Sequence, residues 1–272
     1  MSVRLIVLLC LVVNTCSAQI DSTRVNSLND SRSVGHDGLT VIRAIGHVAT
    51  APTRWDGNDW LRAGGVVALT TASFFLDDET SDLMKRNQSS FNTGVSDIVV
   101  EYGSGYFAAG LTVATYLTGI VVKDDWLRET AVLMGGTVLF TTAATTLGKA
   151  VIGRARPYTG FGSREFSPLK NRSAYRSFPS GHATNAFAIS AVLASRIKNP
   201  WASVGLYGVA TFTAVSRIYS DDHWLSDVVF AAAYSTAVAH SIVNWFENES
   251  SESSHGFRFM PTPNGVSVVW RF

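Results

Sequence analysis

The chain has 272 residues, of which 46% are hydrophobic and 16% are charged, and its formal net charge is +1. This length suits one large domain with tails, and the apolar fraction is high enough to build a sizeable core. Nucleic-acid-binding proteins carry an extended basic face, whereas the basic residues here concentrate in one loop. We therefore expect no nucleic-acid partner.

Residues 1–18 have the pattern of a secretory signal peptide. Arg4 precedes an apolar run from Leu5 to Val13, and the small residues Cys16-Ser17-Ala18 form a cleavage site. Cleavage there would remove both cysteines of the chain, so we expect no disulfide in the mature protein.

A polar segment, residues 19–58, follows the signal peptide. It has no sustained hydrophobic period, which predicts a leader that is loosely ordered or drapes over the domain.

Residues 59–248 form a series of apolar helical segments separated by polar breaks. The predicted helices cover residues 60–77, 98–122, 127–152, 182–197, 200–216 and 224–246. The pattern therefore predicts an all-α fold, a bundle of six helices.

Two of these segments have the length and composition of membrane spans. Residues 104–122 are uncharged and long enough, and residues 130–147 are comparable, whereas residues 65–76 and 202–215 fall short of the roughly 20 residues that a span requires. Glycine, serine and threonine are abundant in all of them, which suits helix packing in a membrane and also the core of a soluble bundle. We favour a membrane-embedded bundle, with a soluble bundle as the alternative.

The last segment, residues 249–272, is a tail with a predicted β-hairpin. Strand-forming residues lie on both sides of Asn264-Gly265, a dipeptide typical of hairpin turns.

Three separated blocks of residues carry the chemistry. They are Lys149-Ala-Val-Ile-Gly-Arg-Ala-Arg156-Pro157, Pro179-Ser180-Gly181-His182, and Ser216-Arg217 followed by His223 and Asp227. The predicted helices 182–197 and 200–216 run antiparallel, and so the start of one, the end of the other and the end of helix 127–152 meet at the same end of the bundle. Two histidines, three fixed cations and one aspartate are the groups that metal-free phosphoryl transfer needs.

In order and spacing the blocks match the pattern KxxxxxxRP, PSGH and SRxxxxxHxxxD. Over about residues 60–246 the chain therefore resembles the type 2 phosphatidic acid phosphatase family, whose site is shared with vanadium haloperoxidases and bacterial class A acid phosphatases. The resemblance implies the six-helix fold and a phosphatase activity.

The two histidines are the predicted catalytic groups. His223 and Asp227 would share one face of a helix, where the carboxylate orients the imidazole as the nucleophile that forms a phosphohistidine. His182, at a predicted helix start, would protonate the leaving oxygen and then activate water.

The remaining motif residues are predicted to bind phosphate. Lys149, Arg156 and Arg217 would neutralise its oxygens, and Ser180 and the Gly181 N–H would also bind them.

Other charged residues are expected to have no such role. Arg154 is assigned to a solvated helix end, as is the run Asp77-Asp78-Glu79. Asp221 and Asp222 precede the nucleophile where many relatives carry smaller residues. No group of side chains has metal-ligand spacing, and we expect neither a metal nor a cofactor.

The residues favour a phosphatase that acts on a phosphorylated lipid, of the phosphatidic acid or prenyl pyrophosphate type, at the cell envelope. We expect a membrane location with the site facing the periplasm. The alternatives are a soluble periplasmic acid phosphatase of broad specificity, a vanadate-dependent haloperoxidase, which the short chain disfavours, and a binding module without activity, which the intact motifs disfavour.

Overall fold

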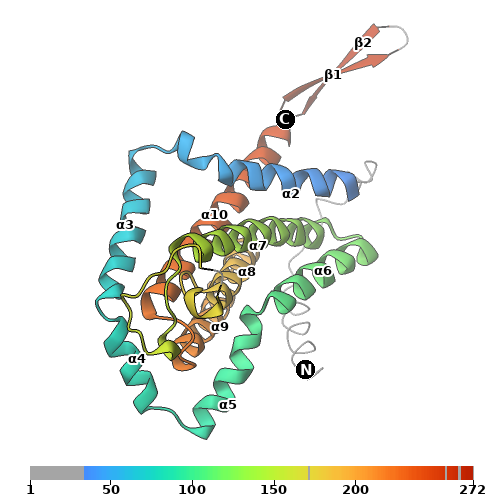
Figure 1. The fold of residues 1–272 in the computed structure, drawn as a ribbon. Helices are drawn as coiled ribbons and strands as arrows, with labels where there is room; N and C mark the ends of the chain where they lie inside the picture. The colour runs from blue at the N-terminus through green and yellow to red at the C-terminus, as the bar shows by residue number, and fades with distance from the viewer. Residues whose placement is uncertain (1–33, 171, 255, 263–264, 272) are drawn as a thin grey trace. The chain divides into compact units, whose positions relative to one another are not determined.

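The structure, a computed structural model, describes residues 34–272 except residues 171, 255, 263–264 and 272. Within these residues the chain forms nine α-helices and one two-stranded sheet (Figure 1). The helices are α2 (Val34–Ala49), α3 (Gly57–Phe74), α4 (Asp77–Arg86), α5 (Ser90–Val99), α6 (Gly105–Val122), α7 (Asp125–Ile152), α8 (Gly181–Ile197), α9 (Pro200–Tyr219) and α10 (Leu225–Ser254). Four 3-10 turns connect them: η3 (Ala51–Arg54), η4 (Val100–Gly103), η5 (Pro157–Thr159) and η6 (Ser173–Tyr175). The expected signal peptide lies outside the described residues.

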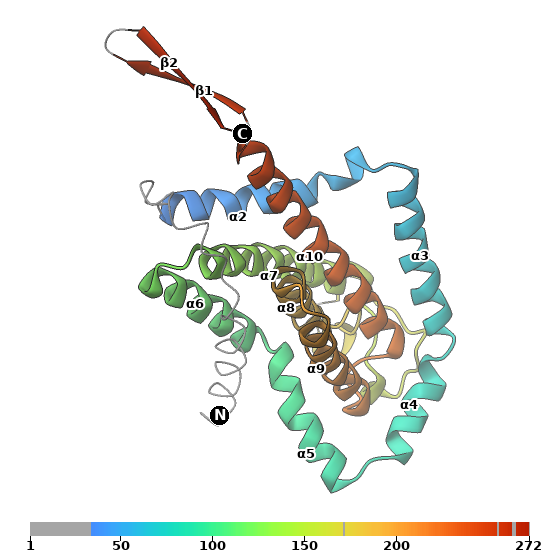
Figure 2. The same cartoon turned by 180° about the vertical axis from the view of Figure 1, so that it is seen from behind.

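Helix α8 is the centre of the bundle. It packs against α7, α9 and α10, and Figures 1 and 2 show these helices together from opposite sides. Fully buried alanines along α8, such as Ala186 and Ala191, let the neighbouring backbones approach closely. Larger apolar side chains from the partners fill the remaining space, among them Leu133 of α7 and Ile242 of α10. This packing holds the ends of four helices in fixed positions.

Helix α7 buries a row of threonines that its own backbone satisfies. Thr137 and Thr141 are fully buried, and their hydroxyls donate to the carbonyl oxygens four residues earlier, both at 2.8 Å. A threonine whose hydroxyl is bonded in this way costs little to bury. The polar composition of this helix is therefore compatible with a buried position.

Three helices among the described residues are long and apolar enough to cross a membrane: α6, α7 and α10 through Ser251. The first two correspond to the predicted spans 104–122 and 130–147. Only 11% of the α6 span is buried inside the protein, so most of its apolar surface is available to lipid. Helices α3 and α9 are not among these candidate spans, in agreement with the short apolar runs 65–76 and 202–215 that they contain.

The helix count differs from the sequence prediction of six. Two short helices, α4 and α5, occupy residues that were expected to form a polar break. Ser89 caps α5 by accepting the Asn92 N–H at 3.2 Å, and Ser104 starts α6 by accepting the Phe107 N–H at 3.1 Å. Ten-residue helices with mixed polar faces carry too short an apolar period to stand out in the sequence.

Of the two alternatives for residues 19–58, a loosely ordered leader or one that drapes over the domain, the described residues of the second half fit the latter. Helix α2 and turn η3 lie there, and residues 19–33 are outside the described part. Asp37 of α2 is buried and accepts hydrogen bonds from Arg128 at 2.6 Å and from the Tyr116 hydroxyl at 2.8 Å. These bonds to α6 and α7 hold α2 against the rest of the domain.

At the C-terminal end, β1 (Gly256–Thr262) and β2 (Gly265–Arg271) pair antiparallel, with Gly256 opposite Arg271 and Thr262 opposite Gly265. The two residues between the strands lie outside the described residues.

Candidate active site

The first motif block spans the end of α7 and the loop after it. Lys149, in the last turn, donates from Nζ to the carbonyl oxygens of Arg176 at 2.7 Å and Ser177 at 3.3 Å. Gly153 ends the helix with φ +60°, and a Cβ atom there would lie 2.1 Å from the carbonyl oxygen of Ser167. Only glycine fits this tight turn, which redirects the chain toward Arg156.

The second block begins α8. Ser180 is the N-cap residue, and its Oγ accepts the Ala183 N–H at 3.4 Å. The hydroxyl predicted to bind phosphate is therefore engaged as a helix cap as well. His182 follows in the first turn of α8, and the N-terminus of a helix favours an anion. Burial, together with the charge of Arg217, lowers the His182 pKa to about 4.

The third block spans the end of α9 and the start of α10. Arg217 lies in the last turn of α9, whereas His223 lies in the loop before α10. The prediction that His223 and Asp227 share one face of a helix is therefore wrong, because α10 begins at Leu225 and only Asp227 lies on it. Their contact is still made: Asp227 Oδ2 lies 3.4 Å from His223 Nδ1, within range of an ion pair and longer than a good hydrogen bond.

His223 is almost completely enclosed. Its pKa is lowered to about 3: burial is the largest cause, the charges of Lys149 and Arg156 act in the same direction, and Asp227 opposes them. The imidazole is thus neutral at neutral pH and keeps the lone pair that a nucleophile needs.

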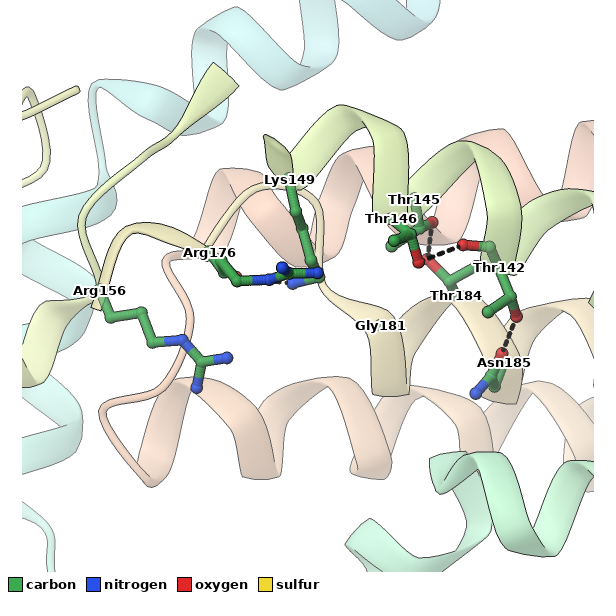
Figure 3. Close-up of a pocket in the computed structure, with 9 residues that line it drawn as sticks. All are labelled: Thr142, Thr145, Thr146, Lys149, Arg156, Arg176, Gly181, Thr184 and Asn185. Carbon is green, nitrogen blue, oxygen red and sulfur yellow. Dashed lines mark hydrogen bonds between the residues drawn. The ribbon is translucent and has the colours of Figure 1, made fainter. Parts of the chain in front are cut away.

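A cavity of about 260 Å³ opens beside these blocks. Its lining residues are Thr142, Thr145, Thr146, Lys149, Arg156, Arg176, Gly181, Thr184 and Asn185. Figure 3 shows the ends of the Lys149 and Arg176 side chains at the same place, with the guanidinium of Arg156 pointing toward them. Arg176 is a cation at the site that the motif pattern did not identify, because it lies in the loop between the first two blocks.

The motif residues are therefore brought together by the fold. Lys149, Arg156 and Gly181 line one cavity, and the charges of Lys149, Arg156 and Arg217 act on His182. No group of three or more His, Cys, Asp or Glu side chains in the described part of the chain is arranged to hold a metal ion.

Arg154 has a different position from the one predicted. It is 1% exposed, and it donates from Nη2 to Asp77 at 2.6 Å and from Nη1 to Asp227 at 2.8 Å. Asp77, also assigned to a solvated helix end, is fully buried and accepts the Ser226 N–H and hydroxyl as well. Asp77 lies far away in the sequence, and only tertiary contact reveals this network.

Asp227 is fully hydrogen-bonded. Its Oδ1 accepts from Arg154, and its Oδ2 accepts from the Ser177 hydroxyl at 2.5 Å and the Trp224 N–H at 2.9 Å. These donors fix the carboxylate that faces the His223 ring.

Asp222 lies between two of the predicted phosphate ligands. Its Oδ1 accepts from Arg156 Nη1 at 2.7 Å, and its Oδ2 makes a short contact with Arg217 Nη2. The sequence marked this aspartate only as a departure from relatives.

Residues 130–251 match a family model described as the PAP2 superfamily. This segment contains all three motif blocks, and the match agrees with the resemblance that the motifs predicted.

Two relatives and one solved structure extend this result. Lipid A 1-phosphatase of Porphyromonas gingivalis is 28% identical over 223 residues, which cover 78% of this chain and 43% of that protein. Lipid A 1-phosphatase of Rhizobium johnstonii is 35% identical over 100 residues, which cover 36% of this chain and 40% of that protein. The chain thus spans less than half the length of both relatives.

The crystal structure of LpxE from Aquifex aeolicus superposes with a TM-score of 0.50 at 21% identity, covering 62% of this chain and 95% of that chain. At this identity the likeness shows a shared fold and nothing more.

Proposed function

We propose that the protein is a metal-independent phosphatase that hydrolyses a phosphorylated lipid through a phosphohistidine. The observation that carries the proposal is the convergence of His182 and the buried His223 on a cluster of arginine and lysine side chains. Such a cluster supplies fixed positive charge where a phosphoryl group gains negative charge in the transition state.

In the first step the free ring nitrogen of His223 attacks phosphorus, and the bond from phosphorus to the ester oxygen breaks. Asp227, held by Arg154, Ser177 and the Trp224 N–H, stabilises the cationic ring that forms. Bound phosphate favours the protonated form of His182, and this imidazolium gives its proton to the departing oxygen and becomes neutral.

In the second step His182 takes a proton from a water molecule as that water attacks the phosphohistidine. The nitrogen–phosphorus bond breaks, and inorganic phosphate and both free histidines are regenerated. His182 therefore alternates between acid and base, a role worth about 10² to 10⁴ in rate.

Two observations support a lipid substrate. Three helices of the described part have the length and composition of membrane spans, and α7 and α10 among them carry proposed site residues. Two similar proteins are named for the hydrolysis of a phosphorylated lipid. Lys149 lies in the last turn of α7 and Asp227 in the first turn of α10, so these two proposed site residues lie at the ends of candidate membrane spans. A headgroup phosphate could reach it there while the acyl chains stay in the bilayer.

The decisive experiment traps the intermediate. Purified protein is mixed with a ³²P-labelled lipid phosphate and quenched in alkali, in which a phosphohistidine survives, and an acid wash should release the label. His223→Gln should retain no label and no turnover, whereas His240→Gln, a change away from the motifs, should behave as wild type. Label that persists on His223→Gln would overturn the proposed nucleophile.

A substrate panel tests the lipid assignment. Lipid A 1-phosphate, phosphatidic acid and a prenyl pyrophosphate should be hydrolysed with higher kcat/KM than p-nitrophenyl phosphate, and the protein should stay in the membrane pellet after a carbonate wash. Release without detergent and a preference for the soluble ester would favour the soluble acid phosphatase instead.

The proposed orientation places the site on the periplasmic side. Both native cysteines lie in residues 1–18, so single cysteines can be introduced as reporters. Tyr158→Cys beside the site should react with a membrane-impermeant maleimide in cells with a permeabilised outer membrane. Asp125→Cys, at the other end of α7, should react only after the inner membrane is opened. The reverse result would place the site in the cytoplasm.

A further inference from the structure

Asp222 forms a bridge between two arginines that the motifs assign to phosphate. Each carboxylate oxygen contacts a different guanidinium, Oδ1 that of Arg156 and Oδ2 that of Arg217. A phosphate presents pairs of oxygens to guanidinium groups in the same way. The carboxylate therefore uses the same donors that a substrate phosphate would need.

The two arginines keep further donor capacity at this place. Among the described residues, the buried Nε atoms of Arg156 and Arg217 have no hydrogen-bond partner. A carboxylate has two oxygens, whereas a phosphate has up to four, so the larger anion can satisfy donors that the carboxylate leaves unbonded.

The loop that carries Asp222 is held in place by its neighbour. Asp221 has φ +60°, its carboxylate contacts Lys85 at 3.2 Å and accepts the Ser81 hydroxyl at 3.2 Å, and its carbonyl accepts the Tyr158 N–H at 3.0 Å. These partners come from α4 and η5, and none of them takes part in the bridge between Arg156 and Arg217. Asp221 thus anchors the loop, and Asp222 is left as the residue aimed at the arginines.

Asp222 is also less enclosed than the other carboxylate near the nucleophile. Its side chain is 24% exposed, whereas that of Asp227 is fully buried. A partly exposed carboxylate can move into water at modest cost, because solvent replaces the ion pairs that it gives up.

We propose that Asp222 is an internal competitor for the phosphate site, which the substrate phosphate displaces and which returns to expel inorganic phosphate after hydrolysis. The inference rests on the proposed function. It assigns Asp222 a role in setting phosphate affinity, since an anion that binds two arginines tightly would otherwise be slow to leave.

The test measures phosphate binding directly. The dissociation constant of inorganic phosphate is determined by calorimetry on the full-length protein in detergent, for wild type, Asp222→Asn and Asp221→Asn. Asn keeps the shape of the side chain and removes its charge, so Asp222→Asn should bind phosphate about tenfold or more tightly. The matched change Asp221→Asn should stay within about twofold of wild type.

A second measurement follows turnover. Phosphate should inhibit Asp222→Asn at correspondingly lower concentration, and Asp222→Glu, which restores the charge, should return the inhibition constant toward the wild-type value. Should Asp222→Asn fail to fold, Asp222→Ser takes its place with the same expected tightening.

Weaker or unchanged phosphate binding by the folded Asp222 variants would overturn the inference, because the aspartate would then orient the arginines or do nothing. This failure is distinct from that of the proposed function. A wild-type protein that hydrolyses lipid phosphate while Asp222→Asn binds phosphate no better refutes only the competitor. Tighter phosphate binding by Asp222→Asn in a protein without turnover refutes only the phosphatase.

Discussion

Two aspartates flank the nucleophile, and they differ in what surrounds them. Asp227 is fully buried and accepts hydrogen bonds from Arg154, Ser177 and the Trp224 backbone. Asp222 is partly exposed and contacts Arg156, which lines the cavity, and Arg217. One carboxylate is enclosed by donors that no substrate could replace, and the other uses donors that a phosphate could take.

Burial decides the role of each carboxylate. Removing a partner from a fully buried ion pair leaves a charge that water cannot reach, which costs about 3–5 kcal/mol. The same change at a partly exposed pair is softened by solvent. We therefore interpret Asp227 as a fixed orienting group and Asp222 as a movable one, and four predictions test this contrast.

The largest effect is expected for Asp227→Asn. The amide cannot hold the His223 ring in the tautomer that leaves the attacking nitrogen unprotonated, so kcat should fall by about 10⁴-fold. Activity against a lipid phosphate checks this, with circular dichroism to verify folding. A loss smaller than that of Asp222→Asn would reverse the contrast between the two aspartates.

The next effect is on stability. Arg154→Met leaves Asp77 and Asp227 buried without their cation, which should cost about 3–5 kcal/mol and lower the Tm by roughly 10 °C. The control is Arg62→Met, because Arg62 is 79% exposed in its pair with Asp59 and should change stability by less than about 0.5 kcal/mol. Equal Tm values for the two variants would show that the Arg154 network is not stabilising.

A smaller effect concerns protonation of His182. Its pKa of about 4 means that the imidazole is neutral at pH 7 in the free protein. Bound phosphate adds negative charge, which favours the protonated form, so the pKa should rise and protons should be taken up on binding. Histidine ¹⁵N shifts followed from pH 3.5 to 8, with and without phosphate, measure the change; His182→Gln identifies the resonance. A His182 midpoint that phosphate leaves unchanged would contradict its role as the proton donor.

The smallest expected effect is that of chelation. Because arginine and lysine supply the positive charge on both sides of the site, excess EDTA should leave kcat within about twofold of its untreated value. Vanadate, which adopts five-coordinate geometry, should inhibit under the same conditions. Activity that EDTA abolishes and magnesium restores would refute the metal-independent mechanism.

The sequence predicted the motif residues and their convergence, because these depend on order, spacing and the antiparallel run of neighbouring helices. It also predicted the apolar lengths of α6 and α7, which composition alone sets. It missed α4 and α5, whose ten residues each are too few to show a long apolar period, and it placed His223 on a helix that begins only at Leu225.

What the sequence by itself determined is local: which residue types occur, at what spacing, and how long the apolar runs are. What only the tertiary structure decided is which charges are buried and which partners they meet. The sequence pattern predicts Arg154 to be a solvated residue at a helix end. In the structure it is a buried cation, because α4 brings Asp77 against it. Asp221 and Asp222 are the same residue type side by side, and one anchors a loop while the other bridges two arginines. The physical reason is that burial and long-range ion pairs are set by elements distant in the chain, which no local pattern records.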